Sequence, residues 1–450
     1  MTHQGLLCLI PTLVVLVLSV LSRRTFESLV ASCVAGFILL NGWGFFGGLT
    51  TAMTKVMQDP TIGWIIIVCG SFGSLIHMLV KAGGAQAFGN YVIRFVKSRR
   101  SALITTWLMG LVIFIDDYLN ALVVGSSMKK VTDKFCISRE MLAYVVDSTA
   151  APVCVLVPLS TWAVYVAGLL ESTGVAAKGE GLQAYIQTIP YIAYGWTAML
   201  LVPVVAFGWI PALGAMRAAE RRAGAGQTIP PHSEGMGIPE HDNITNPYPR
   251  LVHFALPLAV LLGATIALKA DALKGVLIAV VFTVIYFHFA KVANWKKSVD
   301  DVFDGFKTML YPLALIVMSF VLKEANDRLG LTQFVIEKVS PWMDSRYLPV
   351  ITFLSLSLIS FTTASLWGMY AIALPIVVPL AQQLGVDTWL AVGAVVSAGA
   401  FGSHACFYSD ATILSATACG CNNIQHAVTQ LPYTLLAATA AAGIFLLLGL

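Results

Sequence analysis

Two adjacent aspartates, Asp116 and Asp117, lie in IFIDDYLNALVV (residues 113–124), a stretch that is otherwise almost wholly apolar. A further aspartate, Asp147, follows in YVVDSTAAPV. A carboxylate withdrawn from water holds a proton at a pH at which an exposed carboxylate would not, and a hard cation surrounded by oxygens can displace that proton. A site that binds either ion, and never both, exchanges them when it opens alternately to the two sides of a membrane.

Oxygen-bearing residues near these carboxylates extend the candidate site. We predict Asp117 and Asp147 as sodium ligands and Asp116 as a second titratable group. Neutral ligands are expected from residues near these aspartates and from the corresponding part of the second half: Asn120, Ser148, Thr149, Thr363 and Ser365.

The stretch VVSAGAFGSHACFYSD (residues 395–410) adds Ser403, His404 and Asp410. A histidine titrates near physiological pH, so His404 is either a proton carrier or a hydrogen-bonded packing residue.

The composition places these residues in a membrane. The chain of 450 residues is 58% hydrophobic and only 11% charged, against roughly 25% charged in an average soluble domain. Twelve apolar runs approach the length of about 20 residues that crosses a bilayer. They begin near Gly5, Glu27, Thr61, Ser101, Met141, Ala184, Leu251, Ala272, Thr308, Tyr347, Trp389 and Ala427. The net charge of +4 and the short basic loops disfavour nucleic acid binding, and no cysteine cluster predicts a metal centre.

The polar stretch 214–250 separates two halves, residues 1–213 and 251–450. A shift of about 246 to 248 residues places FIDDYLN (residues 114–120) on TTASLWG (residues 362–368), and Pro11 on Pro257. Such spacing predicts an internal repeat of the kind found in transporters.

Basic residues decide between two topologies. If all twelve runs crossed, the 27 Lys and Arg residues would divide 14 to 13 between the faces; if the fourth run of each half is a hairpin, they divide 19 to 8. The positive-inside rule favours the hairpins. We therefore predict an all-α membrane protein of two inverted repeats, each with five crossings, one re-entrant hairpin (about 101–135 and 347–384) and one broken helix (about 140–170 and 388–418). Residues 214–250 form a cytoplasmic linker in this topology, and both termini lie outside.

A resemblance to a known family points the same way. The stretch DDYLNALVVGSSMKKVTDKFCISREMLAYVVDSTAAPVCVLVPLSTW (residues 116–162) closely resembles the NhaC family of sodium/proton antiporters, and the likeness continues in SDATILS at Ser409 and TQLPY at Thr429. The resemblance implies the ion transporter superfamily, elevator-type motion and often a dimer. It also adds Ser409 and Thr412 to Asp410 as site residues.

The chain departs from the family pattern around GSHACF, where Ser403 replaces a usual aspartate. This loss of charge keeps an alternative open, in which protons or sodium drive transport of a small organic solute such as an amino acid, amine or carboxylate. Aromatic residues near the breaks could surround such a solute: Tyr118, Trp162, Tyr165, Trp367, Tyr370, Phe407 and Tyr408.

The leading prediction is a sodium/proton antiporter in a bacterial-type inner membrane. Its partners would be the lipid bilayer, sodium and protons, and a second copy of the chain in a homodimer. No cofactor is expected beyond these coupling ions. A channel is disfavoured, since inverted repeats with charged breaks suit alternating access, and no nucleophile and base stand out to indicate an enzyme.

Overall fold

The computed structural model describes most of the chain. The described residues are 3–22, 24–114, 117–158, 160–172, 174–231, 233, 250–268, 271–339, 344–364 and 366–449. Every regular element in these ranges is a helix, which confirms the all-α prediction.

Four of the described helical stretches are long and apolar enough to cross a membrane, and three bent pairs raise the number of candidate spans to seven. Five shorter apolar helices accompany them. The chain is therefore a multi-pass membrane protein.

The helices of the first half run in this order: α1 (Ile10–Ser22), α2 (Thr25–Asn41), α3 (Phe45–Met57), α4 (Pro60–Lys81), α5 (Gly84–Ile93), α6 (Arg99–Val112), α7 (Asp117–Lys134), α8 (Arg139–Thr149), α9 (Ala151–Cys154), α10 (Thr161–Ser172), α11 (Gly181–Thr188) and α12 (Ala193–Phe207). α13 (Gly214–Gly224) occupies the first part of the polar stretch that separates the halves.

The second half contains α14 (Val252–Ala267), α15 (Ala272–Phe289), α16 (Trp295–Thr308), α17 (Leu310–Leu329), α18 (Leu331–Val339), α19 (Leu348–Thr363), α20 (Leu366–Gln383), α21 (Thr388–Ala405), α22 (Asp410–Cys419) and α23 (Asn423–Gly449).

Helix boundaries recur between the two halves at a nearly constant interval. The first positions of the paired helices show this: α2 and α15 (25 and 272), α3 and α16 (45 and 295), α4 and α17 (60 and 310), α5 and α18 (84 and 331), α6 and α19 (99 and 348), α7 and α20 (117 and 366), α8 and α21 (139 and 388), and α10 and α22 (161 and 410). The interval of 247 to 250 residues lies within about four residues of the shift that aligns the two halves in the sequence.

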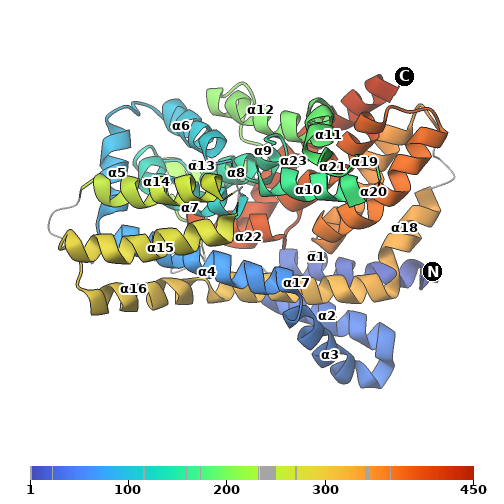
Figure 1. The fold of residues 1–450 in the computed structure, drawn as a ribbon, viewed down its shortest axis with the longest axis horizontal. Helices are drawn as coiled ribbons and strands as arrows, with labels where there is room; N and C mark the ends of the chain where they lie inside the picture. Colours follow the sequence, from blue (N-terminus) through green and yellow to red (C-terminus); the bar gives the residue numbers. More distant parts are fainter. Residues whose placement is uncertain are drawn as a thin grey trace.

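Helices of the two halves pack against each other. α4 lies against α15 and α16 of the second half, and α17 lies against α1 and α2 of the first (Figure 1). α7 likewise packs on α22. Buried contacts between the halves therefore form much of the core.

A helix pair stands at each position where a hairpin is predicted. α6 ends at Val112 and α7 begins at Asp117; α19 ends at Thr363 and α20 begins at Leu366. Ala364, in the second of these breaks, has a left-handed backbone (φ 52°), which turns the chain between the two helices. At the other end of the first pair, Arg99 Nη1 donates a hydrogen bond to the carbonyl of Cys136 at 3.3 Å. The two outer ends of this helix pair therefore lie together.

The two predicted broken helices also have breaks. Ala150 interrupts the helix between α8 and α9, just before Pro152, whose ring cannot continue the hydrogen-bond ladder. α21 and α22 meet at 41°. Both regions also use a serine in the same way. Ser160 Oγ donates to the carbonyl of Cys154 and Ser409 Oγ donates to the carbonyl of Ser403, each at 2.5 Å, and the two serines directly precede the paired helices α10 and α22.

α4 and α16 pack at a contact made of small residues. A methyl group added to Gly305 would lie 2.5 Å from Ser74 Cα and 2.7 Å from the carbonyl oxygen of Gly73, both closer than van der Waals contact. The backbones can approach this closely only because Gly305 has no side chain.

We expect Gly305→Ala to destabilise the protein, because the added methyl group meets backbone atoms that cannot rotate away. Overpacking of this kind costs about 1 to 3 kcal/mol. Thermal unfolding in detergent should show a lowered Tm. Gly63→Ala on α4 is the matched control, since a methyl group there has no heavy atom within 4 Å. Equal Tm values for the two variants would contradict the tight contact.

Candidate functional site

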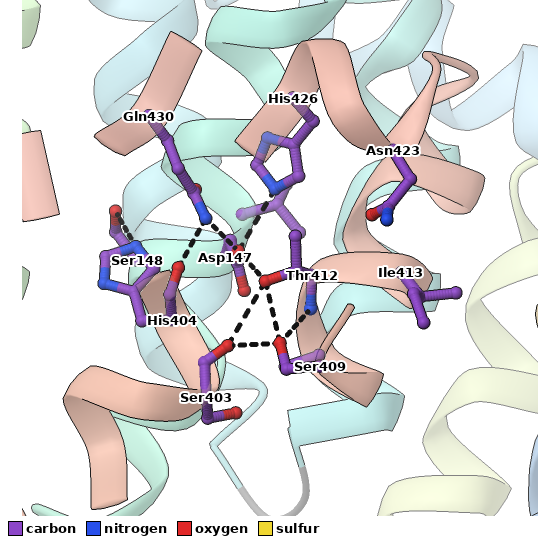
Figure 2. A network of polar contacts seen from close by, with 12 residues as sticks. Asp147, Ser148, Ser403, His404, Ser409, Thr412, Ile413, Asn423, His426 and Gln430 are labelled. Carbon is purple, nitrogen blue, oxygen red and sulfur yellow. Dashed lines mark hydrogen bonds and ion pairs between the residues drawn. The ribbon is translucent and has the colours of Figure 1, made fainter. Parts of the chain in front are cut away.

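Asp147 lies in the last turn of α8, where its side chain is fully buried. Its Oδ2 atom receives three contacts from the second half of the chain (Figure 2). Gln430 Nε2 donates at 2.8 Å, His426 Nε2 lies at 3.1 Å and Thr412 Oγ1 donates at 3.3 Å. Among the described residues, all side chains that bond to this carboxylate of the first half belong to the second half.

Three buried oxygens on side chains in this part of the structure are not used by hydrogen bonds among the described residues, and of these Ser403 Oγ points away from Asp147 (Figure 2). Among the described residues, Asp147 Oδ1, Ser403 Oγ and Gln430 Oε1 have no hydrogen-bond partner. An unpaired buried polar atom normally costs about 1 to 3 kcal/mol. Oxygens left open in this way are suited to a hard cation such as sodium.

His404, on the last turn of α21, links three elements. Its Nε2 lies 3.0 Å from Ser148 Oγ, its Nδ1 lies 2.9 Å from the hydroxyl of Tyr194 on α12, and its carbonyl accepts a hydrogen bond from Gln430. Both ring nitrogens therefore have partners. The two readings of His404 from the sequence, proton carrier and packing residue, both remain predictions.

The turn between α21 and α22 is closed by Ser403, Ser409 and Thr412. The Ser403 carbonyl accepts from Ser409 Oγ at 2.5 Å and lies 3.2 Å from Thr412 Oγ1, and the two hydroxyl oxygens are 2.9 Å apart. Because Thr412 also contacts Asp147, this turn is bonded directly to the carboxylate site.

Asp410, the first residue of α22, is a second buried carboxylate. Its Oδ2 accepts a hydrogen bond from the hydroxyl of Tyr118 on α7, and its Oδ1 accepts from the Ala411 amide at 2.9 Å. Negative charge at a helix N-terminus is favourable. Asp410 thereby connects the second broken helix to the first hairpin region.

Asn120 lies at a separate place from the Asp147 network. Its Nδ2 lies within hydrogen-bond distance of the carbonyls of Gly110 (2.7 Å), Ile113 (2.9 Å) and Thr149 (2.8 Å), and its two hydrogens donate to two of them at a time. These carbonyls stand at the end of α6 and at the break after α8. In this structure Asn120 positions the two breaks, and its role as an ion ligand stays a prediction.

The remaining predicted residues are placed as follows. Asp117 is buried at the first residue of α7, and Thr363 is the last residue of α19, with its hydroxyl on the carbonyl of Ile359 at 2.9 Å. Thr149 Oγ1 bonds back to carbonyls of its own helix. Asp116 and Ser365 lie outside the described residues.

Three contributors to the site were missed by the sequence reasoning: His426, Gln430 and Tyr194. His426 and Gln430 are four residues apart on α23, so they share a face of that helix. Two polar side chains at this spacing in an apolar helix were the available signal, and TQLPY contains Gln430.

Four of the aromatic residues proposed to surround an organic solute contact other parts of the protein, and the side chain of Trp367 lies outside the described part of the structure. The Trp162 and Tyr370 rings meet edge to face at 6.2 Å, and the Tyr408 hydroxyl donates to the carbonyl of Thr362 at 2.8 Å. With Tyr118 bonded to Asp410, these side chains fill space between helices.

Comparison with known proteins places the chain in a family. The chain is 27% identical over 472 residues to an uncharacterized protein of Haemophilus influenzae (strain Rd), an alignment that covers 98% of this chain and 90% of that protein. Among solved structures it is similar to MtrF of Neisseria gonorrhoeae, described as illuminating a class of antimetabolite efflux pumps, with a TM-score of 0.39 and 12% identity over 91% of this chain and 85% of that one. Residues 153–450, which include most of the Asp147 network, match the sequence pattern of sodium/proton antiporters. The chain belongs to the Na+/H+ antiporter family.

Proposed function

We propose that the protein exchanges sodium for protons at Asp147 by alternating access. One observation carries this proposal: a fully buried carboxylate has one oxygen held by three side chains of the other half and the other oxygen without a hydrogen bond among the described residues. The first oxygen fixes the carboxylate, and the second is open to a cation.

Competition between the ions follows from the pairing of Asp147 with His426. A proton shared by this pair and a sodium ion at Asp147 Oδ1 would place two positive charges beside one carboxylate. Two such charges 4 Å apart repel by about 4 kcal/mol at an effective dielectric constant of 20. Either cation alone balances the carboxylate, so binding of sodium expels the proton and binding of the proton expels sodium.

The proposed topology is the inverted repeat with two hairpins. Ion pairs between distant residues support it, because each joins residues that this topology places on one side: Lys55 with Glu324, Lys81 with Asp301, Arg99 with Glu220, Arg222 with Glu140 and His3 with Glu337. If all twelve runs crossed, Arg99 and Glu220 would lie on opposite faces, as would Lys81 and Asp301. The recurring helix boundaries and the serine bonds of Ser160 and Ser409 also support the repeat.

Elevator-type motion of the hairpin regions against the remaining helices, and assembly as a homodimer, complete the proposal. They rest on the resemblance to the NhaC family alone.

The function is tested by transport in proteoliposomes. A pH gradient is imposed, and sodium is added outside. Sodium should dissipate the gradient, and thermal unfolding should shift to higher temperature with sodium alone. If the gradient stays unchanged with sodium but collapses with an amine or an amino acid, the organic-solute alternative replaces the proposal.

The topology has its own expected result. In a Cys136→Ser background, Arg100→Cys and Lys130→Cys should react with an impermeant maleimide from the same side, and Lys178→Cys from the opposite side, since all three positions are exposed. Labelling of Arg100→Cys and Lys130→Cys from opposite sides would contradict the first hairpin.

A further inference from the structure

A segment between the two halves crosses the ends of the helices that carry the site. We call residues 213–231 and Ser233 the strap; it includes α13. Glu220 of the strap accepts hydrogen bonds from the Ser138 amide (3.1 Å) and hydroxyl (2.6 Å) and pairs with Arg99. The strap is thereby attached at the beginnings of both α6 and α8.

The other end of the strap is attached to α23 and to the turn before it. Gln425 Nε2 donates to the Pro231 carbonyl at 2.8 Å, and the Asn422 amide donates to Ser233 Oγ at 2.8 Å. The strap therefore joins the two halves on one side of the Asp147 site.

A cavity of about 340 Å³ lies beneath the strap. Its polar lining comes from Glu140, Arg222, Gln425 and Thr429. Glu140 is only 2% exposed, and both of its oxygens contact Arg222 Nη2, at 2.7 and 3.0 Å. A buried carboxylate is costly without such a partner. Glu140 therefore offers a cation site inside the cavity that Arg222 now occupies.

The cavity and the Asp147 site share two helices. Asp147 follows Glu140 by seven residues on α8. This separation is two helical turns, so both residues lie on the same face of the helix, about 10 Å apart along its axis. Two cavity residues on α23 are also close to the site. Gln425 directly precedes His426 and Thr429 directly precedes Gln430, and both His426 and Gln430 contact Asp147. The cavity thus lies at the strap end of the two helices that hold the carboxylate.

We propose that this cavity is the entrance for cations on the strap side and that the Arg222–Glu140 pair closes it. A sodium ion or proton arriving at Glu140 displaces Arg222, the strap loosens, and the cation continues along α8 toward Asp147. Glu140 and Arg222 are positioning residues of the route. This inference rests on the proposed function, because it takes Asp147 as the destination.

Cys421 is a natural reporter of the strap. It is 3% exposed and directly precedes Asn422, which is bonded to the strap. In reconstituted full-length protein, alkylation of each cysteine by N-ethylmaleimide is followed by mass spectrometry. Arg222→Gln should accelerate alkylation of Cys421 by about tenfold or more, since it removes the partner of a buried charge. Arg221→Gln is the matched control, because Arg221 is the exposed neighbour on the same helix.

Transport in the same vesicles completes the test. Arg222→Gln and the shape-conserving Glu140→Gln should both change the sodium concentration for half-maximal exchange by about fivefold or more, Arg222→Lys should restore much of the wild-type value, and Arg221→Gln should leave it unchanged. Unchanged Cys421 alkylation overturns the inference, and so does faster alkylation with an unaltered sodium dependence. Neither result contradicts the proposed function. That proposal is contradicted if wild-type protein shows no sodium-dependent exchange, or if Asp147→Asn retains the exchange.

Discussion

Asp147→Asn should reduce sodium-dependent proton exchange to below about 1% of the wild-type rate. The asparagine amide can occupy the same space, but it neither carries the charge that attracts sodium nor binds a proton in exchange. A hundredfold loss corresponds to about 2.7 kcal/mol, which is modest for removing the charged group of a buried cation site. The measurement is the initial rate of pH-gradient collapse in proteoliposomes of matched protein content.

Asp304→Asn is the control for this substitution. The Asp304 side chain on α16 is 48% exposed. It forms an ion pair with Lys307, which lies one turn further along the same helix. It should exchange at close to the wild-type rate. An Asp147→Asn variant that exchanges as fast as Asp304→Asn would show that the ion site lies elsewhere.

Asn120→Ala should lower the free energy of unfolding by about 3 kcal/mol. The amide group of Asn120 has two hydrogens to donate among three buried carbonyls, and each carbonyl left without a partner costs about 1 to 3 kcal/mol. Asn120→Asp should be worse, because an ionised carboxylate cannot donate and would face the three carbonyl oxygens directly. Thermal unfolding in detergent measures both variants.

Ser126→Ala serves as the comparison on the same helix. Ser126 Oγ bonds back to Leu122 O within α7, a carbonyl that keeps its place in the helix when the hydroxyl is removed. Its Tm should stay close to that of the wild type. If Asn120→Ala unfolds at the same temperature as Ser126→Ala, Asn120 does not hold the breaks together.

The helices and their interruptions could be predicted from the sequence because their signals are local. Pro152 and the glycines near Ser403 mark breaks, and apolar runs mark helices. The repeat then brought distant motifs into correspondence. These signals predict Ser148, Ser403 and His404 as site residues, and the family resemblance adds Ser409 and Thr412; the structure brings all five near Asp147.

The contacts made by α23 could not be predicted in the same way. His426 and Gln430 mark one face of this apolar helix of 27 residues, but the sequence does not indicate which group that face meets. The position of Gln430 opposite Asp147 depends on the packing of α8, α21 and α22 around it. Asn120 shows the same limit. Its residue type suits both an ion ligand and a tie between carbonyls, and only the path of the backbone at Gly110 and Thr149 distinguishes the two.

The close approach of α4 and α16 has a consequence for biosynthesis. Gly73 belongs to the first half of the chain and Gly305 to the second, so the surface of α4 that receives α16 is complete long before its partner exists. At a synthesis rate of about 5 to 20 residues per second, that surface waits roughly 12 to 46 seconds for the ribosome to deliver α16. During this interval the glycine and serine backbone of α4 at this contact faces other partners, and the α4–α16 contact forms only after synthesis of the second half has begun.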